Sequence, residues 1–89
     1  MHPSKEQINS DLKKILVEDL FVEIPLEKIK DSDSLSTDVG LDSVGQIEFV
    51  SMIEERYGIK VDVKKSAAEL KTVGSAADFV WKNLPAVRE

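Results

Sequence analysis

The chain has 89 residues, of which 42% are hydrophobic, and its 12 basic and 17 acidic side chains give a formal net charge of −5. This composition is typical of one small acidic globular domain. A domain of this size buries only about 60–65% of its unfolded surface, which favours a binding or carrier module over an enzyme with a deep active site. The absence of cysteine and the terminal position of the single histidine, His2, argue against a zinc site, a disulfide and His-based catalysis.

No segment approaches the roughly 20 apolar residues of a membrane span, and the N-terminus lacks the apolar core of a signal peptide. We therefore expect a cytoplasmic protein that does not enter a membrane. The sequence has no repeat and no low-complexity linker, so residues 1–89 are expected to form one domain with a core from about 4 to 84. Met1 and the short tails favour a discrete chain over a module of a longer protein, and a monomer is expected.

The first predicted helix runs from about 4 to 20. Ser4 and Gln7 have the spacing of a capping box, and apolar residues follow at helical spacing: Ile8, Leu12, Ile15, Leu16 and Leu20. Pro25 then interrupts the helical pattern. The connection over 21–41 is rich in Ser, Asp and Gly, but it still carries seven apolar residues after its first position, so it is expected to pack over the helices.

The second predicted helix begins after Asp42, a favourable N-cap residue, and ends near Tyr57, where Gly58 suits the left-handed conformation of a C-cap. Five side chains at helical spacing are expected to face the core: Gln46, Phe49, Val50, Ile53 and Tyr57. The opposite side and its flanks carry a different set: Val44, Ile47, Glu48, Ser51, Glu54 and Glu55.

Residues 59–64 alternate between apolar and polar, which by period alone favours a strand. Because no second strand is available to pair with this segment, we interpret it as an extended connector in which Ile59 and Val61 plug the core. The connector leads to a short helical turn around Ser66 to Leu70.

Thr72 is expected to cap a last helix that ends at Pro85. The apolar face of this helix comprises Val73, Ala76, Ala77, Val80, Trp81 and Leu84. The predicted fold class is therefore all-α: a small four-helix bundle of three longer helices and one short helix, with a long loop between helix 1 and helix 2.

The net charge is concentrated in one part of the chain. Within 33–56, six acidic side chains oppose one arginine, so this segment carries the net charge of the whole chain: Asp33, Asp38, Asp42, Glu48, Glu54, Glu55 and Arg56. Such a local negative field attracts a basic partner surface and repels nucleic acid. A solvated helix face without a function is the alternative.

Ser43, directly after the predicted cap, decides which chemistry this region can support. A hydrolase nucleophile is disfavoured, because Leu41 replaces the first glycine of a G-x-S-x-G elbow and no general base is available to activate the hydroxyl. A phosphate attached to Ser43 would be stabilised by the N–H groups and the positive end of a helix N-terminus. From the residues alone, an ordinary helix-capping serine is the commoner explanation.

The acidic residues before Ser43 are a poor match to a calcium-binding loop. Asp31 and Asp33 take the first and third positions, but Leu35 stands at the fifth. Ser36 then replaces the turn glycine and Asp42 the bidentate glutamate. No metal site is predicted, and these acids are expected to form turns, caps and partner contacts.

Several features resemble the acyl carrier protein family: the Gly40-Leu41-Asp42-Ser43-Val44 pentad, the acidic second helix, the long first loop and the Leu70–Val73 segment entering a helix. The resemblance covers about 4 to 84. In that family the serine of the Asp-Ser motif is esterified by 4′-phosphopantetheine from coenzyme A, and the cofactor thiol carries acyl groups as thioesters. The resemblance implies that Ser43 is this serine, modified by a phosphopantetheinyl transferase, and that the protein is a carrier, not an enzyme.

The resemblance also implies a partner surface on the second helix, where acidic residues meet basic residues of enzymes. The matching residues are Asp42, Val44, Ile47, Glu48, Ser51, Glu54 and Glu55. Expected partners are an acyl-loading ligase or acyltransferase, and a ketosynthase or other acyl-processing enzymes, with transient and salt-sensitive docking. A further set of residues either lines an acyl pocket or only forms the core: the core face of the second helix together with Val61, Leu70, Ala76 and Ala77.

Three positions depart from the housekeeping fatty-acid carriers: Val44 where Leu is commoner, Gly45 where Asp is usual, and Ser51 where an apolar residue is frequent. Gly45 also weakens the first helical turn by up to about 1 kcal/mol relative to alanine. A basic patch follows the helix, at Lys60, Lys64 and Lys65. These departures favour polyketide or other specialised natural-product biosynthesis. The alternatives are a housekeeping fatty-acid carrier, an aminoacyl or peptidyl carrier, and a cofactor-free acidic helical adaptor.

Overall fold

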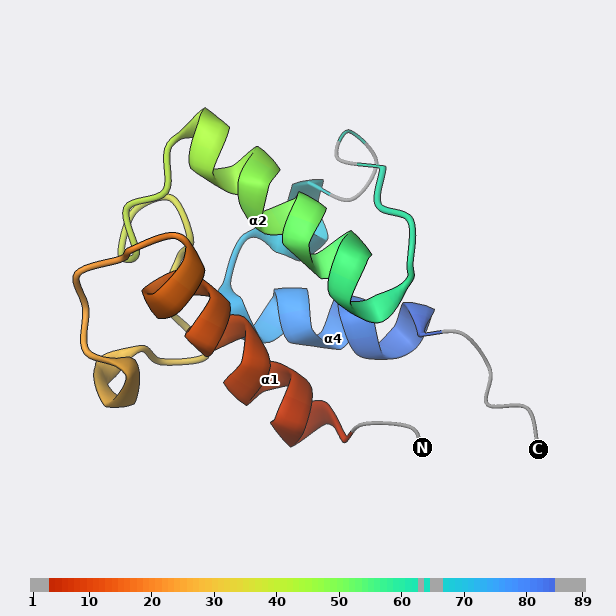
Figure 1. The fold of residues 1–89 in the computed structure, drawn as a ribbon, viewed down its shortest axis with the longest axis horizontal. Helices are drawn as coiled ribbons and strands as arrows, with labels where there is room; N and C mark the ends of the chain where they lie inside the picture. Colours follow the sequence, from red (N-terminus) through yellow and green to blue (C-terminus); the bar gives the residue numbers. More distant parts are fainter. Residues whose placement is uncertain (1–3, 63, 65–66, 85–89) are drawn as a thin grey trace.

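The computed structural model describes residues 4–62, 64 and 67–84. Three α-helices form its body: α1 (Lys5–Lys14), α2 (Ser43–Tyr57) and α4 (Val73–Asn83). A short 3-10 helix (Ala67–Leu70) precedes α4, and a single 3-10 turn (Leu26–Lys28) lies in the first loop. Figure 1 shows α1 beside α4, with α2 lying across from both. The predicted all-α bundle is confirmed, and the short helix is a 3-10 helix.

The described part of the chain contains no strand, since its only β-type pairing is an isolated bridge between Ser34 and Thr72. Ile59 is buried and Val61 packs against the core, as expected for an extended connector. Ser66, at which the short helical turn was expected to begin, lies outside the described residues. None of the described helices is long and apolar enough to cross a membrane.

Helix α1 begins at the predicted cap, because Ser4 Oγ accepts a hydrogen bond from the backbone N–H of Gln7 at 3.1 Å. Its last turn widens into a π-helical segment, Ile15–Asp19, so the helical stretch ends close to the predicted position. Phe21 follows with a φ of +58°, a left-handed conformation that is uncommon for a bulky residue. The first loop therefore starts from a tightly turned helix end.

The core is shared by the helices and the first loop. Helix α1 and its π-turn contribute Ile8, Leu12, Ile15 and Leu16. Helix α2 contributes Phe49, Val50 and Ile53, as predicted. The first loop adds Ile29, Leu35, Val39 and Leu41, which confirms that this connection packs over the helices.

Helix α4 starts with a full capping box: the N–H of Ser75 donates to Thr72 Oγ1 at 3.0 Å, and the N–H of Thr72 donates to Ser75 Oγ at 3.1 Å. The prediction that Trp81 faces the core is wrong, since its side chain is 43% exposed and Lys5 Nζ lies 5.4 Å from its ring centroid. The core extends instead around the other flank of α4, where Phe79 is buried. Pro85, the expected helix end, lies outside the described residues.

Backbone hydrogen bonds tie the first loop to the start of α4. The N–H of Gly74 donates to the Asp31 carbonyl at 2.8 Å, and that of Leu35 donates to the Lys71 carbonyl at 2.8 Å. A Cβ on Gly74 would lie 3.1 Å from the Asp31 carbonyl oxygen, so the glycine permits this close approach. The loop is thereby held against α4 and leads in a defined path to α2.

Candidate functional site

The residues before α2 form a fixed approach to its N-terminus. Gly40 has a φ of +90°, a conformation that glycine adopts without strain. Leu41 is buried, and its N–H donates to the carbonyl of Leu35 at 2.9 Å. The chain is thus anchored in the core one residue before the surface position Asp42.

Asp42 is the N-cap of α2, as predicted. Its Oδ1 accepts a hydrogen bond from the N–H of Gly45 at 2.7 Å, and its carbonyl accepts one from the N–H of Gln46 at 2.9 Å. A Cβ on Gly45 would lie 3.2 Å from both Asp42 Oδ1 and Leu41 Cδ2. Gly45 therefore leaves room for the cap and for the buried leucine, in addition to its intrinsic cost in a helix.

Ser43 is the first residue of α2, and it is exposed. Its hydroxyl lies at the end of the helix where the macrodipole and the first-turn N–H groups favour an attached phosphate. A phosphate-linked group at this position needs no enclosed pocket in the protein, because the covalent bond to Ser43 Oγ is enough to hold it. The residues present therefore fit a phosphate-linked group at Ser43.

The acids before Ser43 make local contacts. Asp33 Oδ2 accepts from the N–H of Lys30 at 2.9 Å, and Asp38 Oδ2 accepts from the N–H of Ser34 at 2.8 Å, so both form turns as expected. In the described ranges, no group of three or more His, Cys, Asp or Glu side chains is placed to hold a metal ion.

The outer side of α2 brings together most of the residues singled out as a partner surface. Val44 is 64% exposed and Ile47 58% exposed, which is high for large apolar side chains. Three polar members of the set are exposed on the same helix: Glu48, Ser51 and Glu55. The start of α2 therefore combines apolar and acidic groups on its surface.

Glu54, another residue of the expected partner surface, makes a contact within the fold. It is half-buried, and its Oε2 accepts a hydrogen bond from the N–H of Val61 at 2.8 Å. The contact ties the connector after α2 back to the helix. The Glu54 carboxylate therefore makes an internal contact, which the helical spacing alone did not show.

The far end of α2 is attached to α1. The hydroxyl of Tyr57 donates to Asp11 Oδ2 at 3.1 Å, and Arg56 Nε lies 3.8 Å from the same oxygen. Burial and the neighbouring Asp11 carboxylate raise the pKa of Tyr57 well above its ordinary value. This end of α2 is thus a structural contact, whereas its first turns are exposed.

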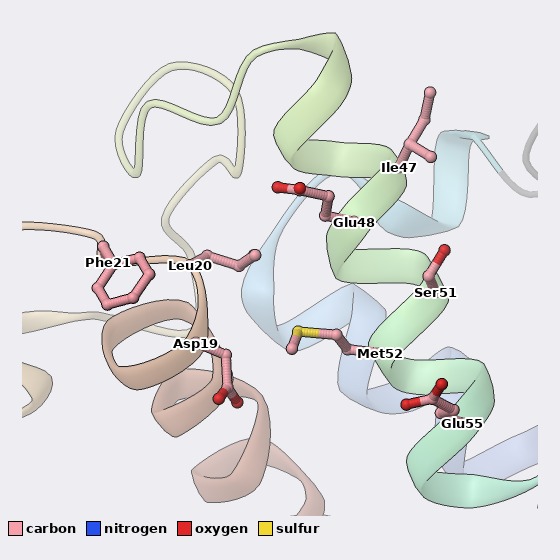
Figure 2. Close-up of a pocket in the computed structure, with 8 residues that line it drawn as sticks. All are labelled: Asp19, Leu20, Phe21, Ile47, Glu48, Ser51, Met52 and Glu55. Atoms are coloured by element: carbon pink, nitrogen blue, oxygen red, sulfur yellow. The ribbon is translucent and has the colours of Figure 1, made fainter.

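A groove of about 430 Å³ runs between α2 and the end of the α1 region (Figure 2). One wall comprises Asp19, Leu20 and Phe21, and the other comprises Ile47, Glu48, Ser51, Met52 and Glu55. In Figure 2, Leu20 and Met52 extend toward one another from the two sides, and the Phe21 ring lies beside Leu20. A second groove of about 450 Å³ shares Leu20, Phe21 and Glu48 and reaches Asp42 and Val44.

Sequence patterns give no sign that Asp19, Leu20 and Phe21 form one wall of the first groove, or that Met52 lies in the other wall. Phe21 directly follows the predicted first helix, but helical periodicity carries no signal for a left-handed residue or for a neighbour on α2. Leu70, one of the residues expected either to line an acyl pocket or to form the core, lines a groove of about 320 Å³ together with Gln46 from α2. Ala76 and Ala77 are fully buried in the core.

Comparisons with known proteins agree with this architecture. Residues 10–80 match the family model described as "Phosphopantetheine attachment site". The acyl carrier protein of Rhodopseudomonas palustris (strain TIE-1) is 40% identical over 77 residues, covering 86% of this chain and 94% of that protein. The acyl carrier protein of Bradyrhizobium sp. (strain ORS 278) is 39% identical over the same length, with the same coverage.

A solved structure of the acyl carrier protein from Enterococcus faecalis has a TM-score of 0.76 to this chain, at 25% identity, and covers 91% of this chain and 99% of its own. The family match spans most of the chain, and both the sequence relatives and the structural neighbour are acyl carrier proteins. The chain therefore belongs to the acyl carrier protein family, and its cofactor is a covalently attached 4′-phosphopantetheine.

Proposed function

We propose that Ser43 is the attachment point of 4′-phosphopantetheine and that a phosphopantetheinyl transferase modifies it. The observation that carries the proposal is an exposed serine at the first position of α2, directly after the Asp42 cap and the buried anchor Leu41. In the transfer, Ser43 Oγ attacks the phosphorus that bears the pantetheine arm of coenzyme A, and the phosphoanhydride bond breaks as the new phosphodiester forms. Adenosine 3′,5′-bisphosphate leaves, and the hydroxyl proton passes to a base of the transferase. The attached group supplies a thiol that holds acyl chains as thioesters, which a chain without cysteine cannot supply itself.

Incubation with coenzyme A and a broad-specificity phosphopantetheinyl transferase tests the attachment. Intact-mass measurement should show one added phosphopantetheine on the wild type and none on Ser43→Ala. Ser10→Ala is the matched control, because Ser10 is an exposed serine of α1 outside the proposed docking surface and its loss should leave loading unchanged. An unmodified wild type would favour a cofactor-free adaptor, and loading of Ser43→Ala would move the site elsewhere.

We further propose that the outer side of α2 docks the enzymes that load and process the acyl group: a ligase or acyltransferase, and a ketosynthase or related enzyme. Exposed apolar residues, Val44 and Ile47, lie beside the acids Glu48 and Glu55 on this side. Apolar contact at the centre and charge steering at the rim suit an enzyme that must bind briefly and release.

Reversing both Glu48 and Glu55 to Lys should raise the KM of a partner enzyme for the carrier about tenfold at low salt, with a smaller effect at high salt. The control reverses Glu6 and Glu27, which are also exposed and change the net charge by the same amount. Equal KM values for the two double variants would show that only net charge matters and that α2 is not the docking surface.

We propose a specialised pathway, such as polyketide or related natural-product assembly, over housekeeping fatty-acid synthesis. The support is the set of departures at Val44, Gly45 and Ser51, together with the close packing that Gly45 permits at the cap. Intact-mass measurement of the protein purified from its native host identifies the attached acyl unit. A mixture of saturated fatty acyl chains of increasing length would assign the housekeeping role instead, and an aminoacyl thioester would assign the aminoacyl carrier role.

A further inference from the structure

Phe21 combines a left-handed backbone conformation with an exposed aromatic side chain, an unusual pair of features for a large apolar residue. It is the only described residue other than glycine with a positive φ, +58°, and its side chain is 80% exposed. A left-handed residue at a helix end is usually glycine or asparagine, because a Cβ is strained there. A phenylalanine at this position carries the strain and gains little from burial, and such outliers concentrate at functional sites.

The end of the α1 region produces this geometry. The N–H of Leu20 donates to the Ile15 carbonyl at 3.0 Å, and the N–H of Val22 donates to the Leu16 carbonyl at 2.9 Å. These bonds close the wide π-type turn around Phe21 and hold it at the groove wall that faces α2. The ring is thus positioned by backbone contacts that do not depend on its own side chain.

The groove beside Phe21 has an apolar centre and an acidic rim. Its apolar lining is Leu20, Phe21, Ile47 and Met52, and its carboxylates are Asp19, Glu48 and Glu55. The carboxylates come from both walls, and no basic side chain is among the described residues that line the groove. Met52 adds an unbranched, adaptable side chain, which suits a surface that accepts more than one partner.

We propose that this groove, here called the Phe21 groove, binds a segment of a partner enzyme that presents one large apolar side chain between lysines or arginines. The proposal rests on the docking role proposed for α2 and extends the docking surface to the end of the α1 region. The acidic rim favours an occupant with positive charges. An uncharged acyl chain gains nothing from three carboxylates, and a second copy of this acidic chain is repelled by them.

Substitution of Phe21 by glycine separates binding from stability. Phe21→Gly removes the strain and the ring together, so its urea midpoint should be equal to or higher than that of the wild type. Binding should weaken about tenfold, because the contact surface of the ring is lost. If the ring instead stabilised the fold, Phe21→Gly would have a lower urea midpoint than the wild type. A lower urea midpoint would therefore overturn the strain argument.

The binding probe is a synthetic helical peptide with one leucine flanked by lysines, titrated into the isotope-labelled holo protein. Amide shifts should centre on Leu20, Phe21 and Met52, and Phe21→Gly should weaken the affinity about tenfold. Trp81→Ala, which removes an exposed aromatic side chain on α4, is the matched control and should leave the affinity unchanged.

Two further peptides test the chemistry of the occupant. Serine in place of leucine should lower the affinity by removing the apolar contact, and glutamates in place of the lysines should abolish binding by repulsion from the rim. Shifts confined to other surfaces, or equal affinity for all three peptides, would overturn the proposal. So would displacement of the peptide by an acyl group loaded on the protein's own cofactor, which would identify the acyl chain as the occupant.

The loading assay keeps this proposal distinct from the one for Ser43. Phe21→Gly should still accept phosphopantetheine when the transferase is in excess, because Ser43 is unchanged. Normal loading with lost peptide binding supports both proposals. Normal loading with unchanged peptide binding overturns only the Phe21 groove, and an unmodified wild type overturns only the attachment site.

Discussion

The exposed aromatic side chain on the α1–α4 side of the molecule and the one on the α2 groove side differ in their contacts. On the first side, Lys5 lies over the Trp81 ring, and its Nζ pairs with Asp78 Oδ1 at 2.9 Å. On the second side, Phe21 stands out from a strained backbone, close to the exposed residues at the start of α2. One side is closed by its own side chains, whereas the other presents apolar groups for contact.

Acidic residues follow the same division. Asp31 Oδ1 accepts a hydrogen bond from Asn9 Nδ2 at 2.7 Å and pairs with Lys13 Nζ at 3.1 Å, so its charge is used within the fold. Glu48 and Glu55 are exposed at the groove. The comparison teaches that the α1–α4 surface uses its charges within the fold, whereas the proposed docking surface leaves its charges exposed, and substitutions on each surface should act accordingly.

The largest expected effect is on the closed side. Gly74→Val places a branched side chain against the Asp31 carbonyl oxygen, which is backbone and cannot move aside easily. We expect the free energy of unfolding, measured by urea denaturation, to fall by about 2 kcal/mol. Gly45→Ala is the counterpart on the open side and should change it by less than about 1 kcal/mol, because side chains face the new Cβ. Similar losses for the two variants would remove this distinction.

Loss of the α4 cap should have the next largest effect. Thr72→Ala removes one half of the capping box with Ser75 and should lower the free energy of unfolding by about 1 kcal/mol. Phosphopantetheine loading at saturating transferase should stay unchanged, since α4 forms no part of the proposed site. A loading defect as large as the stability defect would show that the two sides are coupled.

Alkaline pH should weaken the contact between α2 and α1. Because the pKa of Tyr57 is raised in the folded state, its contribution to stability is present below the unfolded pKa of about 10 and is lost as pH rises above it. At about pH 10.5 the loss should stay below about 1 kcal/mol, the limit set by ionisation of the unfolded tyrosine alone. Tyr57→Phe should flatten this part of the stability curve, and an unaltered slope in the variant would assign the effect to other groups.

The smallest effect is expected at Asp31. Hydrogen bonding from Asn9 and the contact with Lys13 lower the pKa of this carboxyl below its ordinary value of 3.8. Its contribution is therefore present above that pH and is lost as pH falls through the folded pKa. Because the group is exposed, Asp31→Asn should cost only a few tenths of a kcal/mol at neutral pH, and the difference should vanish in acid. A difference that persists in acid would point to the hydrogen bond from Asn9 and not to charge.

Local rules in the sequence were enough to predict the helices and their starts. Ser4, Asp42 and Thr72 each cap a helix where the residue type and spacing indicated. The buried side of α2 followed from helical periodicity, because Phe49 and Ile53 share one face at 100° per residue. The candidate site at Ser43 came from a short contiguous motif, which depends on the chain order and not on long-range packing.

Other features depended on segments that meet only in the folded chain. The exposure of Trp81, the burial of Phe79 and the contact between Glu54 and Val61 reflect which neighbours cover each flank of a helix. Periodicity defines a face to within a wide arc, so residues at its edge are assigned by packing. The left-handed Phe21 was likewise invisible, since nothing in its residue type favours that conformation.

By itself, the amino-acid sequence determined the all-α class, the position of the acidic second helix and the serine at its start, because caps, periodicity and motifs act over a few neighbouring residues. Only the tertiary structure decided that Phe21 and Met52 share a groove with the acids of α2, although they are far apart along the chain. The physical reason is that a groove is formed by packing two helical segments at a particular distance and angle, and that geometry is set by the whole core.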